Sequence, residues 1–127
     1  VVGAVLIEGA RWFVGRIVLG IERLTAPRPP VRTAEAQARI DAATRNLALY
    51  QFRACPFCVK VRHAMRRLGL NIELRDARKD PVHAAELRSE GGHYQVPCLR
   101  IENEDGIAWL YESKDIIKWL EERFSRS

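Results

Sequence analysis

The chain has 127 residues, a net charge of +5 and three cysteines. Its length suits one domain of ordinary size with room for an additional segment. With 47% hydrophobic and 29% charged residues, it has the composition of a globular protein and not of a disordered one. An odd number of cysteines excludes a scaffold in which every cysteine is paired. The charge excess is small and forms no basic stripe with exposed aromatic residues, so we expect no nucleic-acid partner.

Residues 1–25 predict an apolar, amphipathic helix. On a helical wheel the charged side chains share one face: Glu8, Arg11, Arg16, Glu22 and Arg23. The other faces carry mainly large apolar side chains: Val5, Leu6, Phe13, Val14, Ile17, Ile21 and Leu24. Such a helix is long enough to lie in a membrane interface or to cross a bilayer at marginal cost, so we interpret residues 1–24 as a membrane contact or anchor. Packing on the domain or on a second subunit is the alternative.

Residues 26–46 predict a proline-rich linker followed by a short helix. Pro27, Pro29 and Pro30 favour an extended chain. The alanine-rich stretch after them favours a helix with Thr33 as its cap. If the first segment crosses a membrane, the positive-inside rule places the domain that follows in the cytoplasm. We therefore expect a cytoplasmic domain tethered to the cytoplasmic face of a membrane.

Residues 47–127 predict a compact α/β domain. The elements expected in chain order are strand 47–52, a helix that begins near Cys55 and ends at Gly69, strand 71–75, a helix from Asp80 to about Ser89, strands 96–101 and 108–111, and a helix over 113–124 that Ser113 caps. The order βαβ, α, ββα predicts a four-stranded mixed sheet with helices on both faces. Its first two strands are parallel through a right-handed crossover, and a hairpin forms an antiparallel edge.

The strongest chemical motif is the run from Cys55 to Cys58, with Pro56 and Phe57 between them, at a strand-to-helix turn. Cys55 lies at the predicted helix start, where free backbone N–H groups and the helix dipole favour a thiolate. Pro56 fits the first helical turn because its missing N–H is not needed there. Cys58 is close enough in sequence to form a disulfide with Cys55, so the motif indicates redox chemistry.

Three other interpretations of the two cysteines stay open: half of a zinc site, a buried structural pair, and an iron–sulfur cluster that two chains share through Cys55. A zinc site needs a second pair of ligands, but Cys98 stands alone and His63, His83 and His93 lack ligand spacing. A shared cluster would need ligands from outside the chain. We therefore expect no metal.

Two shorter motifs follow. Val96-Pro97 opens a predicted strand, where proline removes a ladder hydrogen bond. A cis peptide there would expose backbone groups of Val96 beside Cys55, and an ordinary trans proline at a strand edge is the simpler alternative. Glu112 and Ser113 open the last helix, whose first N–H groups form a site for a carboxylate. Simple capping by Ser113 is the alternative.

Together these motifs resemble the glutaredoxin family and, more closely, the N-terminal domains of glutathione S-transferases. The resemblance covers about residues 47–124 and rests on three stretches: LYQFRACPFCVKV for the active site, QVPCL for the segment with a cis-proline, and WLYESKDIIKWLEERF for a Glu-Ser motif and its helix. It implies a thioredoxin-like fold and glutathione as co-substrate.

The resemblance also implies residue roles. Cys55 would be the nucleophile and Cys58 the resolving thiol. The implied glutathione-binding residues are Arg53, Phe57, Val96, Pro97, Glu112 and Ser113. Among these, the backbone of Val96 would form hydrogen bonds with the cysteinyl part of glutathione, and Pro97 would be cis. Glu112 and Ser113 would hold the γ-glutamyl end, and Arg53 would lie near the glycyl carboxylate.

The sequence thus predicts a glutathione-dependent thiol–disulfide oxidoreductase that reduces protein disulfides or glutathionylated proteins. Two alternatives remain. One is a transferase or isomerase of the glutathione S-transferase type, in which bound glutathione is a reactant. The other is a non-enzymatic module, either a membrane-tethered adaptor or a carrier of an iron–sulfur cluster.

Overall fold

In a computed structural model, the chain is described from residue 2 to residue 124, and its side chains from residue 9 onward. Glu8, Val5 and Leu6, which the helical wheel used, lie outside the described side chains. The elements are α1 (Val2–Thr25), α2 (Ala34–Thr44), β1 (Leu47–Gln51), α3 (Pro56–Leu68), β2 (Glu73–Asp76), α4 (Pro81–Ser89), β3 (Cys98–Asn103), β4 (Gly106–Tyr111) and α5 (Ser113–Phe124).

The four strands form one mixed sheet in the order β2-β1-β3-β4. Strand β1 is parallel to β2 and antiparallel to β3, and β3 pairs with β4 as an antiparallel hairpin. This arrangement confirms the predicted sheet. Every residue of β1 is buried, because β1 is central and both faces of the sheet are covered.

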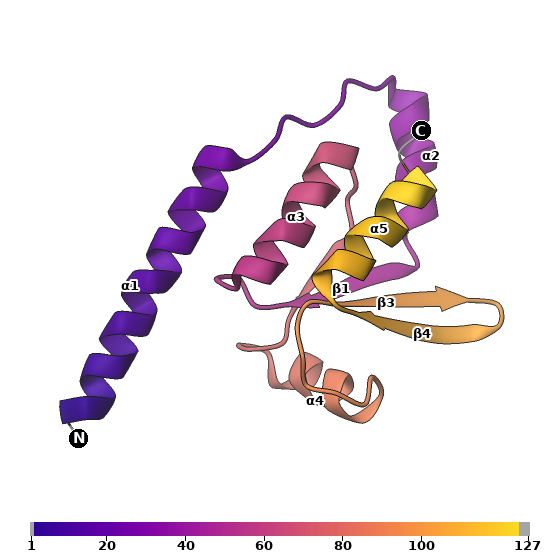
Figure 1. The fold of residues 1–127 in the computed structure, drawn as a ribbon. Coiled ribbons are helices and arrows are strands. Elements are labelled where there is room, and N and C mark those ends of the chain that lie inside the picture. The colour runs from indigo at the N-terminus through magenta and orange to yellow at the C-terminus, as the bar shows by residue number, and fades with distance from the viewer. Residues whose placement is uncertain (1, 125–127) are drawn as a thin grey trace.

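Helices α3 and α5 lie side by side on one face of the sheet, and α4 covers the other face (Figure 1). Because side chains alternate between the two faces along β1, Leu47 and Leu49 lie in the core under α3 and α5, and Tyr50 lies in the core under α4. Helix α2 adds Ile40 to the larger core. The smaller core under α4 joins Tyr50, Leu87 and Cys98.

Local signals in the sequence locate several helix ends. Gly69 ends α3 with a left-handed backbone, at a φ of 68°. Asp80 caps α4 by accepting a 2.9 Å hydrogen bond from the Val82 N–H, and Thr33 caps α2 in the same way. Gly91, just after α4, is required for packing because an added Cβ would lie 2.6 Å from the Tyr111 hydroxyl.

Helix α1 packs on α3 through the face that carries Glu22 and Leu19, and most of its described large apolar side chains are exposed. Glu22 is half-buried against α3, whereas Phe13 and Ile17 are exposed. The predicted amphipathic helix is therefore present, with its polar face turned toward the protein. In the part of the chain that the structure describes, no helix combines the length and hydropathy needed to span a bilayer.

Arg62 on α3 joins α1, the end of β1 and the turn before α3. Its guanidinium donates two hydrogen bonds to the Glu22 carboxylate, at 2.8 and 2.9 Å. It also donates to the side-chain oxygen of Gln51 and to the carbonyls of Phe52 and Arg53, the last at 2.6 Å. The Arg62 guanidinium thus uses most of its N–H donors to hold these three segments together.

The linker is fixed to the far end of α3. Arg32 donates to the carbonyl of Leu68 at 2.6 Å, and Gln37 donates to the carbonyl of Gly69 at 3.0 Å. Arg66 donates to the carbonyl of Pro27 at 2.7 Å. The first two bonds satisfy carbonyls at the end of α3 that have no partner inside the helix.

Replacing Arg62 with methionine should lower the free energy of unfolding by roughly 2 kcal/mol or more, because Glu22 and two loop carbonyls lose their donor. Arg67→Met on the same helix is the matched control. Its side chain is 49% exposed, against 13% for Arg62, and its ion pair with Glu121 lies at the surface. A loss below about 0.5 kcal/mol is expected for the control. Urea denaturation measures both, and equal losses would contradict the role assigned to Arg62.

The Glu22 ion pair should make stability depend on pH in the acid range. Hydrogen bonding from Arg62, followed by the positive charges of Arg62, His63 and Arg53, holds the pKa of Glu22 below its ordinary value of 4.5 despite partial burial. A lowered pKa in the folded state stabilises the protein above 4.5, and this stabilisation is lost as the pH falls through the folded value. The difference in unfolding free energy between the natural protein and Glu22→Gln should therefore shrink below pH 4.5. An unchanged difference in that range would contradict the pairing.

Candidate functional site

Three strands have an end at the same end of the sheet: the C-terminal end of β1, the N-terminal end of β3 and the C-terminal end of β4. Tyr50 of β1 lies opposite Cys98 of β3, and Cys98 lies opposite Tyr111 of β4. The turn that carries Cys55 follows β1, the Val96–Pro97 segment precedes β3, and Glu112 follows β4. The pairing register of these strands therefore brings the three sequence motifs to the same end of the sheet, although about 60 residues separate the first motif from the last.

Cys55 occupies the residue just before α3. Its carbonyl accepts the first helical hydrogen bond, from the Val59 N–H at 2.9 Å, and its side chain makes no capping bond. Its N–H donates to the carbonyl of Phe52, which closes the turn. The Cys55 side chain is partly exposed, so this thiol is accessible at a helix N-terminus.

Cys58 lies one helical turn further along α3 and is buried. Its sulfur accepts a 3.5 Å hydrogen bond from the backbone N–H of Phe52. Burial, reinforced by the adjacent Cys55 sulfur, raises the pKa of the Cys58 thiol to about 12. Burial also raises the pKa of Cys98 to about 12. All three cysteines are free thiols, and they divide into one accessible and two buried groups.

The Val96–Pro97 peptide is cis, as the resemblance implies. Strand β3 begins two residues after the predicted start, at Cys98, because the proline has no N–H to donate to the sheet. Neighbouring side chains hold the segment against the Cys55 turn. The rings of Phe52 and Tyr94 lie 5.8 Å apart, and Val96 packs in the smaller core with Phe52.

Glu112 precedes α5 in a left-handed backbone conformation, with a φ of 71°. Its carbonyl accepts the Ile116 N–H at 3.0 Å, so Glu112 is the residue before the helix and Ser113 is the first helical residue. The prediction that Ser113 caps α5 is therefore wrong by one position. The Glu112 carboxylate accepts a 3.1 Å hydrogen bond from Gln95, which ties the start of α5 to the segment before the cis-proline.

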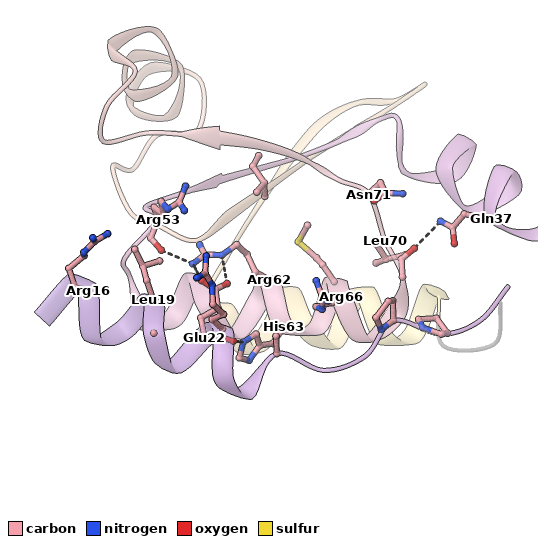
Figure 2. A pocket seen from close by; sticks show the side chains of 18 residues that line it. Arg16, Leu19, Glu22, Gln37, Arg53, Arg62, His63, Arg66, Leu70 and Asn71 are labelled. Carbon is pink, nitrogen blue, oxygen red and sulfur yellow. Dashed lines mark hydrogen bonds and ion pairs between the residues drawn. The ribbon is translucent and has the colours of Figure 1, made fainter. Parts of the chain in front are cut away.

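A cavity of about 890 Å³ lies elsewhere, between α1, the linker and the outer side of α3 (Figure 2). Its lining includes Arg53 but none of the other seven predicted site residues. Arg53, which the resemblance places near the glycyl carboxylate of glutathione, thus also borders this cavity. Phe57 is exposed at the start of α3, with the Lys60 ammonium 5.5 Å from its ring. None of the three cysteines lines this cavity.

Sequence reasoning missed two residues whose hydrogen bonds hold this end of the sheet together. Gln95 was not singled out, although it lies next to Val96-Pro97 and bonds to Glu112. Arg62 fixes the Cys55 turn through the carbonyls of Phe52 and Arg53, and its place one turn after Cys58 was the available signal. Among the described side chains, residues 9–124, no group of three or more potential metal ligands comes together.

A four-stranded mixed sheet, a CxxC motif at the start of a helix and a cis-proline before the adjacent strand define a thioredoxin-like domain. Residues 49–127 match the profile of the family described as "Glutathione S-transferase, N-terminal domain". Because the match covers more than half of the chain, the protein belongs to this family. No curated protein sequence matches the chain.

Two similar solved structures are of maleylacetoacetate isomerase from Anaeromyxobacter dehalogenans 2CP-1. One, with bound dicarboxyethyl glutathione and citrate in the active site, is 28% identical with a TM-score of 0.50, and the match covers 63% of this chain and 37% of that chain. The other, with bound GSH in the active site, is 27% identical with a TM-score of 0.50, over 63% of this chain and 38% of that chain. This chain therefore spans well under half the length of those proteins.

Iodoacetamide added to the native, reduced protein near neutral pH should modify Cys55 at least about tenfold faster than Cys58 or Cys98. Cys55 is accessible, whereas burial keeps the other two thiols protonated and shielded. Mass spectrometry of the digested protein measures the three rates, and the urea-unfolded protein, in which all three should react alike, is the control. Equal modification of Cys55 and Cys58 in the native state would contradict this division.

Proposed function

We propose that this chain is a glutathione-dependent thiol–disulfide exchange module in which Cys55 is the nucleophile. The observation that carries the proposal is a partly exposed Cys55 at the N-terminus of α3 with a buried Cys58 one turn later. Family membership and the GSH bound in a related structure support glutathione as the co-substrate. The free N–H groups and the dipole at the start of α3 favour negative charge on the Cys55 sulfur.

Glutathione would bind at the end of the sheet where the three motifs meet. Its cysteinyl backbone would pair with the backbone of Val96, beside the cis Pro97. Its γ-glutamyl carboxylate would accept from the N–H of Ser113, whose place as the first residue of α5 leaves that N–H without a partner inside the helix. The carboxylate of Glu112 would then accept from the γ-glutamyl ammonium. These contacts would direct the glutathione sulfur toward Cys55.

With a glutathionylated protein, the Cys55 thiolate attacks the sulfur of the glutathione half. A new disulfide forms between Cys55 and glutathione, and the protein leaves as a thiolate that takes up a proton. The thiolate of a second glutathione then attacks the mixed disulfide, which forms oxidised glutathione and returns Cys55 to its thiolate. The net reaction consumes one glutathione and one glutathionylated protein, and yields a protein thiol and oxidised glutathione.

With a protein disulfide, Cys55 first forms a mixed disulfide with the protein. Cys58 then loses its proton and attacks Cys55, which releases the reduced protein and leaves a disulfide between Cys55 and Cys58. Two glutathione molecules reduce this disulfide and become oxidised glutathione. Burial raises the pKa of Cys58 to about 12, so this route requires Cys58 to give up its proton before it attacks.

A transferase or isomerase reaction is the second candidate. The observation that favours it is the similarity to maleylacetoacetate isomerase structures, one of which holds dicarboxyethyl glutathione. Such a reaction uses the sulfur of bound glutathione as the reactant, so it would continue when Cys58 is replaced. The reduction of protein disulfides, in contrast, would stop when Cys58 is replaced, so this reaction separates the two candidates.

Cys55→Ser should reduce the glutathione-dependent release of thiol from a glutathionylated test protein by at least about a hundredfold, because it removes the nucleophile. Cys58→Ser should keep this activity and lose the reduction of protein disulfides. Oxidised glutathione formation, coupled to glutathione reductase and NADPH, measures both reactions. Cys98→Ala is the matched control, because Cys98 is also buried but takes part in neither step.

Equal activity of the natural protein and Cys55→Ser would refute the proposal. Isomerisation of maleylacetoacetate with glutathione that exceeds thiol exchange and persists in Cys58→Ser would establish the second candidate instead.

A further inference from the structure

Five large apolar side chains of α1 face away from the domain. We call them the outer stripe: Phe13, Val14, Ile17, Ile21 and Leu24. They are between 47% and 87% exposed. Their spacing places them on one side of the helix, opposite the side that packs on α3. An exposed apolar surface of this kind marks an interaction site.

Among the described side chains of α1, the charges that flank the outer stripe are all positive. At about 100° per residue, Arg11 lies at one edge of the stripe, and Arg16 and Arg23 lie at the other edge. Among the described side chains of α1, Glu22 is the only acidic one, and its two hydrogen bonds to Arg62 commit it to the domain. The outer stripe is thus flanked by positive charge on both sides, with Arg16 and Arg23 also bordering the cavity between α1 and the domain.

We propose that α1 binds the surface of an anionic bilayer, with the outer stripe at the boundary between the headgroups and the acyl chains. Arginines at both edges of an apolar stripe suit this position, because their apolar stems lie along the stripe while their guanidinium groups reach lipid phosphates. Each cation near an anionic surface adds roughly 1 kcal/mol of attraction.

The same features disfavour a second copy of this chain as the occupant. Two α1 helices packed stripe to stripe would bury the apolar side chains. They would also place the arginines of both copies along one seam, where Glu22 is not free to neutralise them. Anionic lipids supply the missing negative charge, and a second copy does not.

Docking of α1 on α3 would hold the reactive turn close to the membrane. A Cβ built on Gly15 would lie 3.3 Å from the Cβ of Ala54, the residue before Cys55. Helix α1 runs beside α3 and continues past its N-terminal end (Figure 1). If Cys55 is the nucleophile proposed above, its substrates are thiols and disulfides of proteins at a membrane surface.

Vesicle flotation of the full chain tests the proposal, with vesicles of phosphatidylcholine alone or with about a third phosphatidylglycerol. The natural protein should float with the anionic vesicles and much less with the neutral ones. Ile17→Asn combined with Ile21→Asn should weaken binding at least about tenfold, because it removes apolar area from the bilayer. Ile107→Asn on β4 is the matched control and should bind normally, since Ile107 is 45% exposed and Ile17 is 47% exposed.

Circular dichroism and urea denaturation would show that the variants fold. The absence of binding to anionic vesicles, or equal losses for the stripe variant and the control, would overturn the proposal. A dimer in lipid-free solution that the stripe variant abolishes, together with the absence of vesicle binding, would identify a second copy as the occupant. This test measures binding alone, so its result does not depend on the activity of Cys55.

Discussion

The guanidinium of Arg62 is the contact on which the arrangement of the site depends. Its bonds to the carbonyls of Phe52 and Arg53 fix the turn that carries Cys55, and its two bonds to Glu22 fix α1 beside that turn. Lysine could not replace it, because one ammonium cannot hold a carboxylate in two parallel bonds and also reach the turn. The position of Cys55 and the position of the N-terminal helix are therefore coupled through one side chain.

Features with a local physical cause could be predicted from the sequence. Gly69 ends α3 because glycine accepts a left-handed backbone, and Asp80-Pro81 begins α4 because the aspartate accepts a backbone N–H and the proline needs none. The mixed sheet, with its first two strands parallel and a hairpin at one edge, followed from the sequence of elements and the handedness of the crossover. The strand order β2-β1-β3-β4 comes from the structure and brings the three motifs to the same end of the sheet. The cis peptide that the resemblance implies at Val96-Pro97 is present there.

Features that depend on distant partners could not be predicted. The wheel separated a polar face of α1 from an apolar one, and the usual rule would turn the apolar face inward. The reverse is found because Arg62, 40 residues away, offers Glu22 a partly buried partner that no local pattern announces. Arg53 also lines the cavity beside α1, a position that depends on how α1 packs and that no local pattern predicts. The left-handed backbone of Glu112 also escaped prediction, because glutamate rarely adopts it.

The two cysteines of the motif differ because a helix begins between them. The residue before a helix lies outside the first turn and meets solvent, whereas a residue one turn later can point into the core. Burial raises the pKa of Cys58 and favours its protonated form. A dithiol sequence thus folds into a site with one partly exposed and one buried sulfur. In the function proposed above, exchange with glutathione needs only the exposed sulfur, whereas reduction of protein disulfides needs both.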